Sequence, residues 1–323
     1  MVQLCIPQLA WKVPTGQRDK DRLGKIPKTI SFMQNSPQPL AEVFGYTIDD
    51  QSKKAELARK NRLCPYNNNV PNCTKDKAKN PLGVCSVFHD GAPTITCPVR
   101  FREDWKITSD AVSFFFDEDT RWSSLTEVRL LDGYGKSAGN IDVVLVAYDG
   151  EDRVIDFGAL EVQAVYISGN VRDPFEQYMT DPKGQALMDW SKQPNYPRPD
   201  YLSSSRKRLA PQLMFKGGIF NEWGKRSAVA LNKAFFDTLP TLDRVEKKNA
   251  NVGWFVYDLI FDAKTNRYEL TKVDEVFTRF NDALRQITTT KAGPIRTFMN
   301  HLQEKLDEQL ESPPVNKSIE KPF

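Results

Sequence analysis

Two carboxylates lie within two apolar segments of the chain. Asp142 is near the start of Ile141–Tyr148, and Glu161 lies inside Ala159–Ile167. If these segments form adjacent strands, the two side chains can reach the same edge of a sheet and share a divalent cation. Carboxylate oxygens suit Mg²⁺, which activates water and neutralises the charge that develops on a cleaved phosphodiester. The pair therefore predicts metal-dependent phosphodiester hydrolysis.

Two further residues could complete this site. Gln163 stands two positions after Glu161, where a lysine is the commoner residue because it polarises the attacking water. A glutamine can still orient water and donate a hydrogen bond, but it brings no charge. Glu127, expected on a preceding helix, could be a further ligand of the same cation. Taken alone, the spacing favours charged residues at solvent-exposed strand ends, because an Asp followed later by a Glu is common.

Four of the five cysteines fall in one loop-rich stretch rich in Pro, Asn, Gly and Lys. They are Cys64, Cys73, Cys85 and Cys97. Four thiolates can bind one tetrahedral zinc or iron ion, and such a site stabilises a segment that has little core of its own. The gaps are wider than the tight pairs of a zinc ribbon, so four unrelated buried thiols are the alternative. The fifth cysteine, Cys5, is assigned no role.

Basic residues concentrate around positions 206–226 and could contact DNA. Lysine and arginine hold phosphates, and arginine also reads guanine in the major groove. The alternative for each residue is a solvated helix face. Three serines, Ser203–Ser205, precede the run and are expected to cap a helix. The predicted DNA-binding residues are Arg172, Arg206, Lys207, Arg208, Lys216, Lys225 and Arg226.

Composition narrows the classes of protein. The chain has 323 residues, 40% of them hydrophobic and 27% charged, as in ordinary globular proteins. A formal net charge of +3 means that any basic surface must be local. Only two histidines occur, which argues against a zinc hydrolase with several His ligands. No segment resembles a membrane span or a signal peptide, so we expect a cytoplasmic protein whose cysteines are reduced.

The elements that must position these residues alternate between helix and strand. The two apolar segments that hold the carboxylates predict neighbouring strands joined by a turn at residues 149–152. A further strand is expected at Val252–Phe261, paired with Asn266–Thr271. The predicted helices are Leu40–Leu63, with Ser52 among its capping residues, Ser109–Phe116, Leu125–Leu131, one that opens at Asp173–Met179, and Val273–Ile287.

Four regions follow from this pattern. We expect an N-terminal arm and helix over residues 1–63 and a four-cysteine metal-binding subdomain over 64–104. A nuclease core with DNA-binding segments would occupy 105–300, and a C-terminal tail 301–323. The alternation of helices and strands predicts an α/β fold class.

Several segments together resemble one family, the NotI/EagI-like type II restriction endonucleases of the PD-(D/E)xK superfamily. The similar segments are LAEVFGY from Leu40, CPY at Cys64 with the three later cysteines, GNID ending at Asp142, EVQAVYISGNVRD from Glu161, and KRLAPQLMFKG from Lys207. They occur in the family's order and cover residues 40–290. The Glu-x-Gln followed by Ile-x-Gly-Asn-x-Arg-Asp is the most specific of them.

This resemblance implies a function and assigns residues to it. It implies a nuclease core with a mixed sheet flanked by helices, Mg²⁺-dependent cleavage of DNA, an iron site held by the four cysteines, and a homodimer that binds a GC-rich palindrome. Matched position by position, the active-site residues would be Glu127, Asp142, Glu161 and Gln163.

Two other functions stay open at this point. A non-catalytic DNA-binding protein could read DNA with the four-cysteine segment, although paired carboxylates near phosphates would then only repel DNA. A nicking or repair nuclease of the same superfamily is the second alternative.

Overall fold

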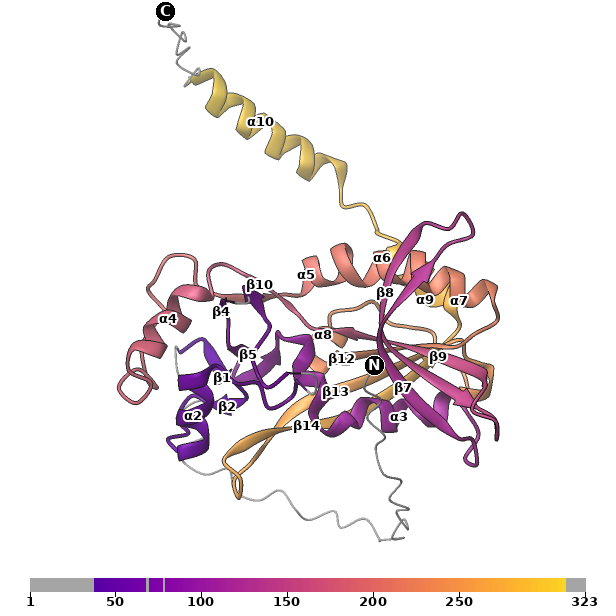
Figure 1. The fold of residues 1–323 in the computed structure, drawn as a ribbon. Coiled ribbons are helices and arrows are strands. Elements are labelled where there is room, and N and C mark those ends of the chain that lie inside the picture. Colours follow the sequence, from indigo (N-terminus) through magenta and orange to yellow (C-terminus); the bar gives the residue numbers. More distant parts are fainter. Residues whose placement is uncertain (1–37, 68–69, 78, 312–323) are drawn as a thin grey trace, which may run out of the picture.

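A mixed six-stranded sheet forms the centre of the protein (Figure 1). The structure, a computed structural model, describes residues 38–67, 70–77 and 79–311. The strand order is β14-β13-β12-β9-β8-β7, and β12 runs parallel to both of its neighbours while the other pairs are antiparallel. The bounds are β7 (Trp122–Leu131), β8 (Ser137–Tyr148), β9 (Val154–Gln163), β12 (Ser227–Asn232), β13 (Val252–Asp262) and β14 (Arg267–Thr278). This confirms the predicted α/β class with a mixed sheet.

Helices cover both faces of this sheet. Helix α3 (Lys106–Phe115) packs on one face, where alternate residues of β9 such as Leu160 and Val162 enter the largest core cluster. On the other face, Leu209 and Leu213 pack against β12 and β13. These two leucines belong to a nearly continuous helical run, which is α5 (Tyr201–Ser204), η2 (Ser205–Leu209), α6 (Ala210–Gln212), η3 (Leu213–Gly217) and α7 (Gly218–Glu222).

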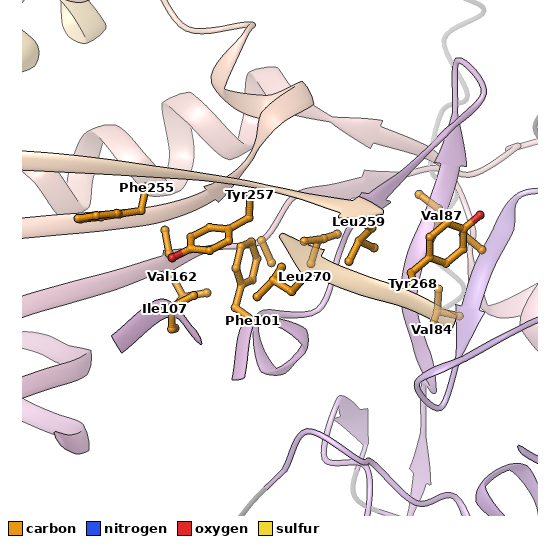
Figure 2. Packing of buried hydrophobic residues seen from close by; sticks show 14 of the residues in the cluster. Val84, Val87, Phe101, Ile107, Val162, Phe255, Tyr257, Leu259, Tyr268 and Leu270 are labelled. Atoms are coloured by element: carbon orange, nitrogen blue, oxygen red, sulfur yellow. The ribbon is translucent and has the colours of Figure 1, made fainter. Parts of the chain in front are cut away.

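A smaller sheet is built from the N-terminal part and the cysteine-containing segment. Its order is β2-β1-β5-β6. The strands are β1 (Leu40–Val43), β2 (Tyr46–Thr47), β5 (Val84–His89) and β6 (Ala92–Ile95). Val84 and Val87 are fully buried in the same cluster as Phe101, Tyr257 and Leu270 (Figure 2). The segment around the cysteines therefore shares the main core of the protein.

Three predicted helices differ from the structure. The segment expected as a helix at Leu125–Leu131 lies in β7, whose alternating half-buried and exposed side chains are typical of an edge strand paired along one side. The helix expected at Val273–Ile287 begins only at α9 (Phe280–Thr288), because β14 stays paired with β13 up to Thr278.

The third difference lies near the N-terminus. The segment expected as one helix from Leu40 begins with β1 and β2, and the helix α2 spans only Lys53–Asn61. Its cap is the one predicted, since the Ser52 hydroxyl accepts a hydrogen bond from the Ala55 backbone N–H at 3.2 Å.

The remaining predicted elements are confirmed. The strands at β8, β9, β13 and β14, the turn at residues 149–152 and helix α3 all form. The helix expected from Asp173 is α4 (Arg172–Thr180). The second carboxylate segment divides, however, because β9 ends at Gln163 and a separate β10 (Tyr166–Ser168) pairs with β11 (Arg198–Asp200).

Five short elements and one longer helix remain in the described part of the chain. The short elements are β3 (Asp76–Lys77), β4 (Asn80–Pro81), η1 (Pro98–Trp105), α8 (Lys233–Phe236) and η4 (Lys247–Asn249), and the longer helix is α10 (Ile295–Glu311). Helix α10 has no buried residue and projects away from the rest of the chain (Figure 1). Among the described helices, none is long and apolar enough to cross a membrane. The expectations for most of the N-terminal arm, for Cys5 and for the end of the C-terminal tail fall outside the described residues.

Candidate active site

The backbone pairing of strands β8 and β9 ends next to the two predicted carboxylates, Asp142 and Glu161. Their antiparallel pairing ends at Val143 and Leu160, so the next opposed pair in register would be Asp142 and Glu161. The carboxylate Oδ2 of Asp142 accepts a hydrogen bond from the Val162 backbone N–H at 2.7 Å. The Asp142 side chain thus accepts the backbone hydrogen bond of β9 at the point where strand pairing stops. The result is a fork between the two strands with one acidic side chain on each arm.

Glu161 is the most perturbed group in this fork. Its side chain is only 8% exposed, and its Oε2 accepts a hydrogen bond from the Lys216 ammonium at 2.6 Å. Burial raises the pKa of Glu161 to about 8; the nearby charge of Asp142 adds to the rise, and Lys216 opposes it. The other carboxylate oxygen, Oε1, is buried without a hydrogen-bond partner.

Gln163 lies on the same face of β9 as Glu161, because side chains two residues apart in a strand point the same way. Its side chain is fully buried, and its amide N–H donates to the side-chain oxygen of Gln212. Its own Oε1 has no partner. Two buried acceptor oxygens therefore lie unpaired on one strand face. Each such atom costs about 1–3 kcal/mol if it stays unpaired, so the pair indicates a place for a ligand.

A widened helix faces these two residues. Within the helical run, η2 and η3 are π-helical, with backbone bonds from Ala210 N–H to Ser205 O and from Gly218 N–H to Leu213 O. Pro211 lies between the two π segments and has no N–H to donate, which weakens regular α-helical bonding there. The run directs Gln212 to Gln163 and Lys216 to Glu161.

Glu127 is turned toward a different partner. It lies on β7 rather than on a helix, and the register of β7 with β8 places its backbone opposite Asp142. Its φ is 56°, in the left-handed region, and its side chain is 57% exposed. The carboxylate pairs with Arg102 at 3.5 Å. The structure thus brings Asp142, Glu161 and Gln163 together and directs the side chain of Glu127 to the rim.

The fork has the donors that a hard cation needs. In the part of the chain that the structure describes, no three His, Cys, Asp or Glu side chains are arranged to hold a metal ion. The fork supplies two carboxylates, together with the unpaired oxygens of Glu161 and Gln163. Mg²⁺ is commonly held by one or two carboxylates and takes its other ligands from water and substrate phosphates. The residues present therefore fit Mg²⁺.

A comparison with known protein families decides the assignment. The model of the family described as restriction endonuclease NotI matches residues 42–270, which contain the whole fork and all four clustered cysteines. The chain belongs to the NotI restriction endonuclease family. It is accordingly a type II site-specific deoxyribonuclease, an enzyme that binds DNA and hydrolyses its backbone. No curated individual protein matches the chain.

The four cysteines of this NotI-family chain line one small cavity. Cys85 lies on β5, Cys97 follows β6, and both line the cavity with Cys64 and Cys73. Its volume is about 10 Å³, the space of a single water-sized sphere. All four are free thiols; burial raises the pKa of Cys64 to about 11, and the proximity of Cys97 and Cys73 adds to the rise. The structure gathers the thiols but leaves them short of metal-ligand geometry.

The predicted DNA-binding residues of this NotI-family enzyme divide into two groups. Arg206 and Lys207 are exposed on the helical run. The other five contact residues of the same chain. Arg208 lies over the Tyr166 ring, and Lys216 bonds to Glu161 in the fork. The remaining contacts are Lys225 with Asp156, Arg226 with the Phe114 carbonyl oxygen, and Arg172 with Asp76 and Glu176. The expected serine cap is wrong, because Asp200 caps the helix by accepting from the Ser203 N–H at 2.8 Å.

Sequence reasoning missed Lys216 as part of the active site. The signal was its helical spacing, because Leu209, Leu213, Lys216 and Phe220 recur at intervals of three and four residues and form one buried stripe. A lysine within such a stripe needs a buried partner. Outside the active site, the sequence also did not indicate the buried ion pair of Arg100. Its guanidinium is fully buried and donates hydrogen bonds to Glu42 at 3.0 Å and to Tyr268 O at 2.8 Å.

Proposed function

We propose that this enzyme cuts both strands of DNA at a specific sequence by Mg²⁺-dependent hydrolysis, with Asp142 and Glu161 holding the ion and Gln163 positioning the attacking water. The observation that supports this most is the fork, where the Asp142 and Glu161 carboxylates lie on adjacent strands and Glu161 and Gln163 each have an unpaired buried oxygen on one face of β9. When bound, Mg²⁺ would activate water and neutralise charge on the phosphodiester.

The chain's own residues have separate tasks in this proposal. The Val162 N–H fixes the Asp142 carboxylate. Glu161 must lose its proton before it can bind a cation, because burial favours its neutral form. The unpaired oxygen of Gln163 can accept a hydrogen bond from water and so orient it. Glu127 could bind the ion only after its ion pair with Arg102 is broken.

Isosteric substitutions test this assignment. Asp142→Asn and Glu161→Gln remove a carboxylate charge and keep its shape, so we expect cleavage of plasmid DNA to fall at least about 1000-fold. Binding of the specific duplex without divalent ions should persist, because less negative charge repels DNA less. Glu246→Gln, which alters an exposed pair with Lys248, is the matched control and should cleave normally. Wild-type rates in both fork variants would remove these residues from the active site.

We further propose that Cys64, Cys73, Cys85 and Cys97 hold one structural iron or zinc ion. The shared cavity, the free thiols and the presence of all four within the matched region support it. Thiolates are soft ligands, which suits iron or zinc and not Mg²⁺. The separate subdomain over residues 64–104 also stays a prediction, as does a cytoplasmic location.

The target is proposed to be a GC-rich palindrome bound by a homodimer. The described residues form one fork, which supports the dimer, because two sites related by a two-fold axis are the simplest way to cut two antiparallel strands. Arginine binds guanine through two hydrogen bonds, which supports a GC-rich site read from the region of Arg206 and Arg208. The competing proposal, a nicking enzyme, differs in cutting only one strand.

A further inference from the structure

We propose that Lys216 is a positioning residue of the active site and supplies, from a helix, the positive charge that position 163 of β9 lacks. This inference rests on the proposed function of the fork. Lys216 is 5% exposed, and its ammonium donates to Glu161 Oε2 at 2.6 Å and to Asn140 O at 2.7 Å.

These two bonds join the arms of the fork. Asn140 belongs to β8, two residues before Asp142, and Glu161 belongs to β9. The pairing of the two strands has ended at this level, so the ammonium is a direct link between them. Because Lys216 holds Oε2 of Glu161, it fixes the rotation of the carboxylate and leaves Oε1 unpaired. Of the three N–H donors of a lysine, one remains for a water or a phosphate oxygen.

The burial of Lys216 argues against its two simpler roles. A residue that only holds the outer DNA backbone keeps its charged end at the surface, as Arg206 and Lys207 do. A residue needed only for packing would be apolar, like its stripe neighbours Leu213 and Phe220. Burying the ammonium of Lys216 beside a carboxyl group carries a large desolvation cost, and an apolar pair of similar volume is often as stable or more stable. The pair is thus better explained by chemistry than by folding.

The test moves the positive charge within the site. Lys216→Gln removes the ammonium, and the exchange variant Gln163→Lys/Lys216→Gln returns it from the strand. The control is Lys233→Gln, because Lys233 also pairs with a carboxylate at 2.6 Å but is 46% exposed. Single-turnover cleavage of a specific duplex, duplex affinity in EDTA, and the thermal midpoint are measured for all variants and the wild type.

We expect Lys216→Gln to cleave at least 100-fold more slowly while its duplex affinity in EDTA stays within 3-fold. The exchange variant should regain at least 10-fold of the lost rate, and Lys233→Gln should match the wild type. If Lys216→Gln does not fold, a folded exchange variant decides: cleavage supports the proposal and inactivity overturns it.

Two other results would also overturn the proposal. One is cleavage by Lys216→Gln within 3-fold of wild type. The other is a loss of duplex affinity that matches the loss of rate, which would make Lys216 a DNA contact. Failure of the proposed function itself is distinguishable, because then the wild-type protein would not cleave.

Discussion

Glu161 combines burial with two charged neighbours of opposite sign. The backbone forces this combination, because the end of β8–β9 pairing places Asp142 opposite Glu161 while η3 brings in Lys216. Burial exceeds the help from the lysine, so the pKa of Glu161 rises to about 8. In the free enzyme, without a bound cation, burial therefore favours the protonated form of Glu161 at neutral pH.

This predicts a pH dependence of stability without divalent cations. In the unfolded chain Glu161 ionises near its ordinary pKa of 4.5, whereas in the folded chain it keeps its proton to about pH 8. The folded state binds more protons between these values, so this group's contribution to stability falls as pH rises, by about 1.4 kcal/mol per pH unit. Below pH 4.5 both states are protonated and the contribution is fully present.

The measurement is the free energy of unfolding in EDTA from pH 5 to pH 8. Glu161→Gln lacks the titrating group, so the wild-type value should decline relative to the variant over this interval. Curves that run parallel would show that Glu161 titrates at its ordinary pKa.

At the residue scale, the strand pattern placed Asp142, Glu161 and Gln163 on neighbouring strands, and the family resemblance, not the spacing alone, singled them out as a candidate site. The sequence did not indicate which side chain would meet them. Lys216 was interpreted as a DNA contact, since a basic run near it suggested an exposed face. Its partner on β9 lies 55 positions away, and such a pairing depends on how the helix packs over the sheet.

At the scale of the elements, strands with a continuous apolar run were predicted from the sequence, whereas strands at the edges of the sheet were predicted wholly or partly as helix. The apolar core strands β8 and β13 could be read directly from the sequence. The edge strand β7 and the end of β14 mix polar and apolar residues in a way that also fits a helix. Their state is decided by the hydrogen bonds of the neighbouring strand, which tertiary structure supplies.

The cysteine-lined cavity leads to a prediction at the scale of the segment it stabilises. Cys73→Ser should lower the thermal midpoint by several degrees before it lowers the specific activity of the soluble fraction, because the thiols lie in the core and away from the fork. Metal analysis of freshly purified wild-type protein should find about one iron or zinc per chain. Active, soluble protein without either metal would contradict the structural site.

Helix α10 leads to a second prediction for an element. None of its residues is buried, so removing residues 290–323 takes no side chain out of the described core. We expect the thermal midpoint of this truncated chain to stay within about 2 °C of the full chain, as for changes that remove no buried contact. Calorimetry on both proteins measures this. A drop of 5 °C or more would mean that α10 packs on the rest of the enzyme.

For the whole molecule, the prediction concerns assembly on DNA. Light scattering with a short specific duplex should give two chains per duplex, and the product should have both strands cut at symmetric positions. Each base contact by arginine should contribute about 1–3 kcal/mol of discrimination, so Arg208→Ala should relax specificity if Arg208 reads a base. One chain per cut duplex, or single-strand nicks as the final product, would favour the nicking enzyme.

The two π-helical segments also constrain how this protein can evolve. Each holds the helix open by roughly one residue, so deleting one residue from η2 would restore regular α-helical bonds in that segment alone. The same deletion would rotate everything after it by about 100°, which would carry Lys216 away from Glu161 and turn the buried side chains of Leu213 and Phe220 out of the core. A regular helix is therefore incompatible with both the active site and the packing of this chain. Selection for stability and selection for cleavage both keep the irregular helix, so single-residue deletions in it should be absent from functional descendants.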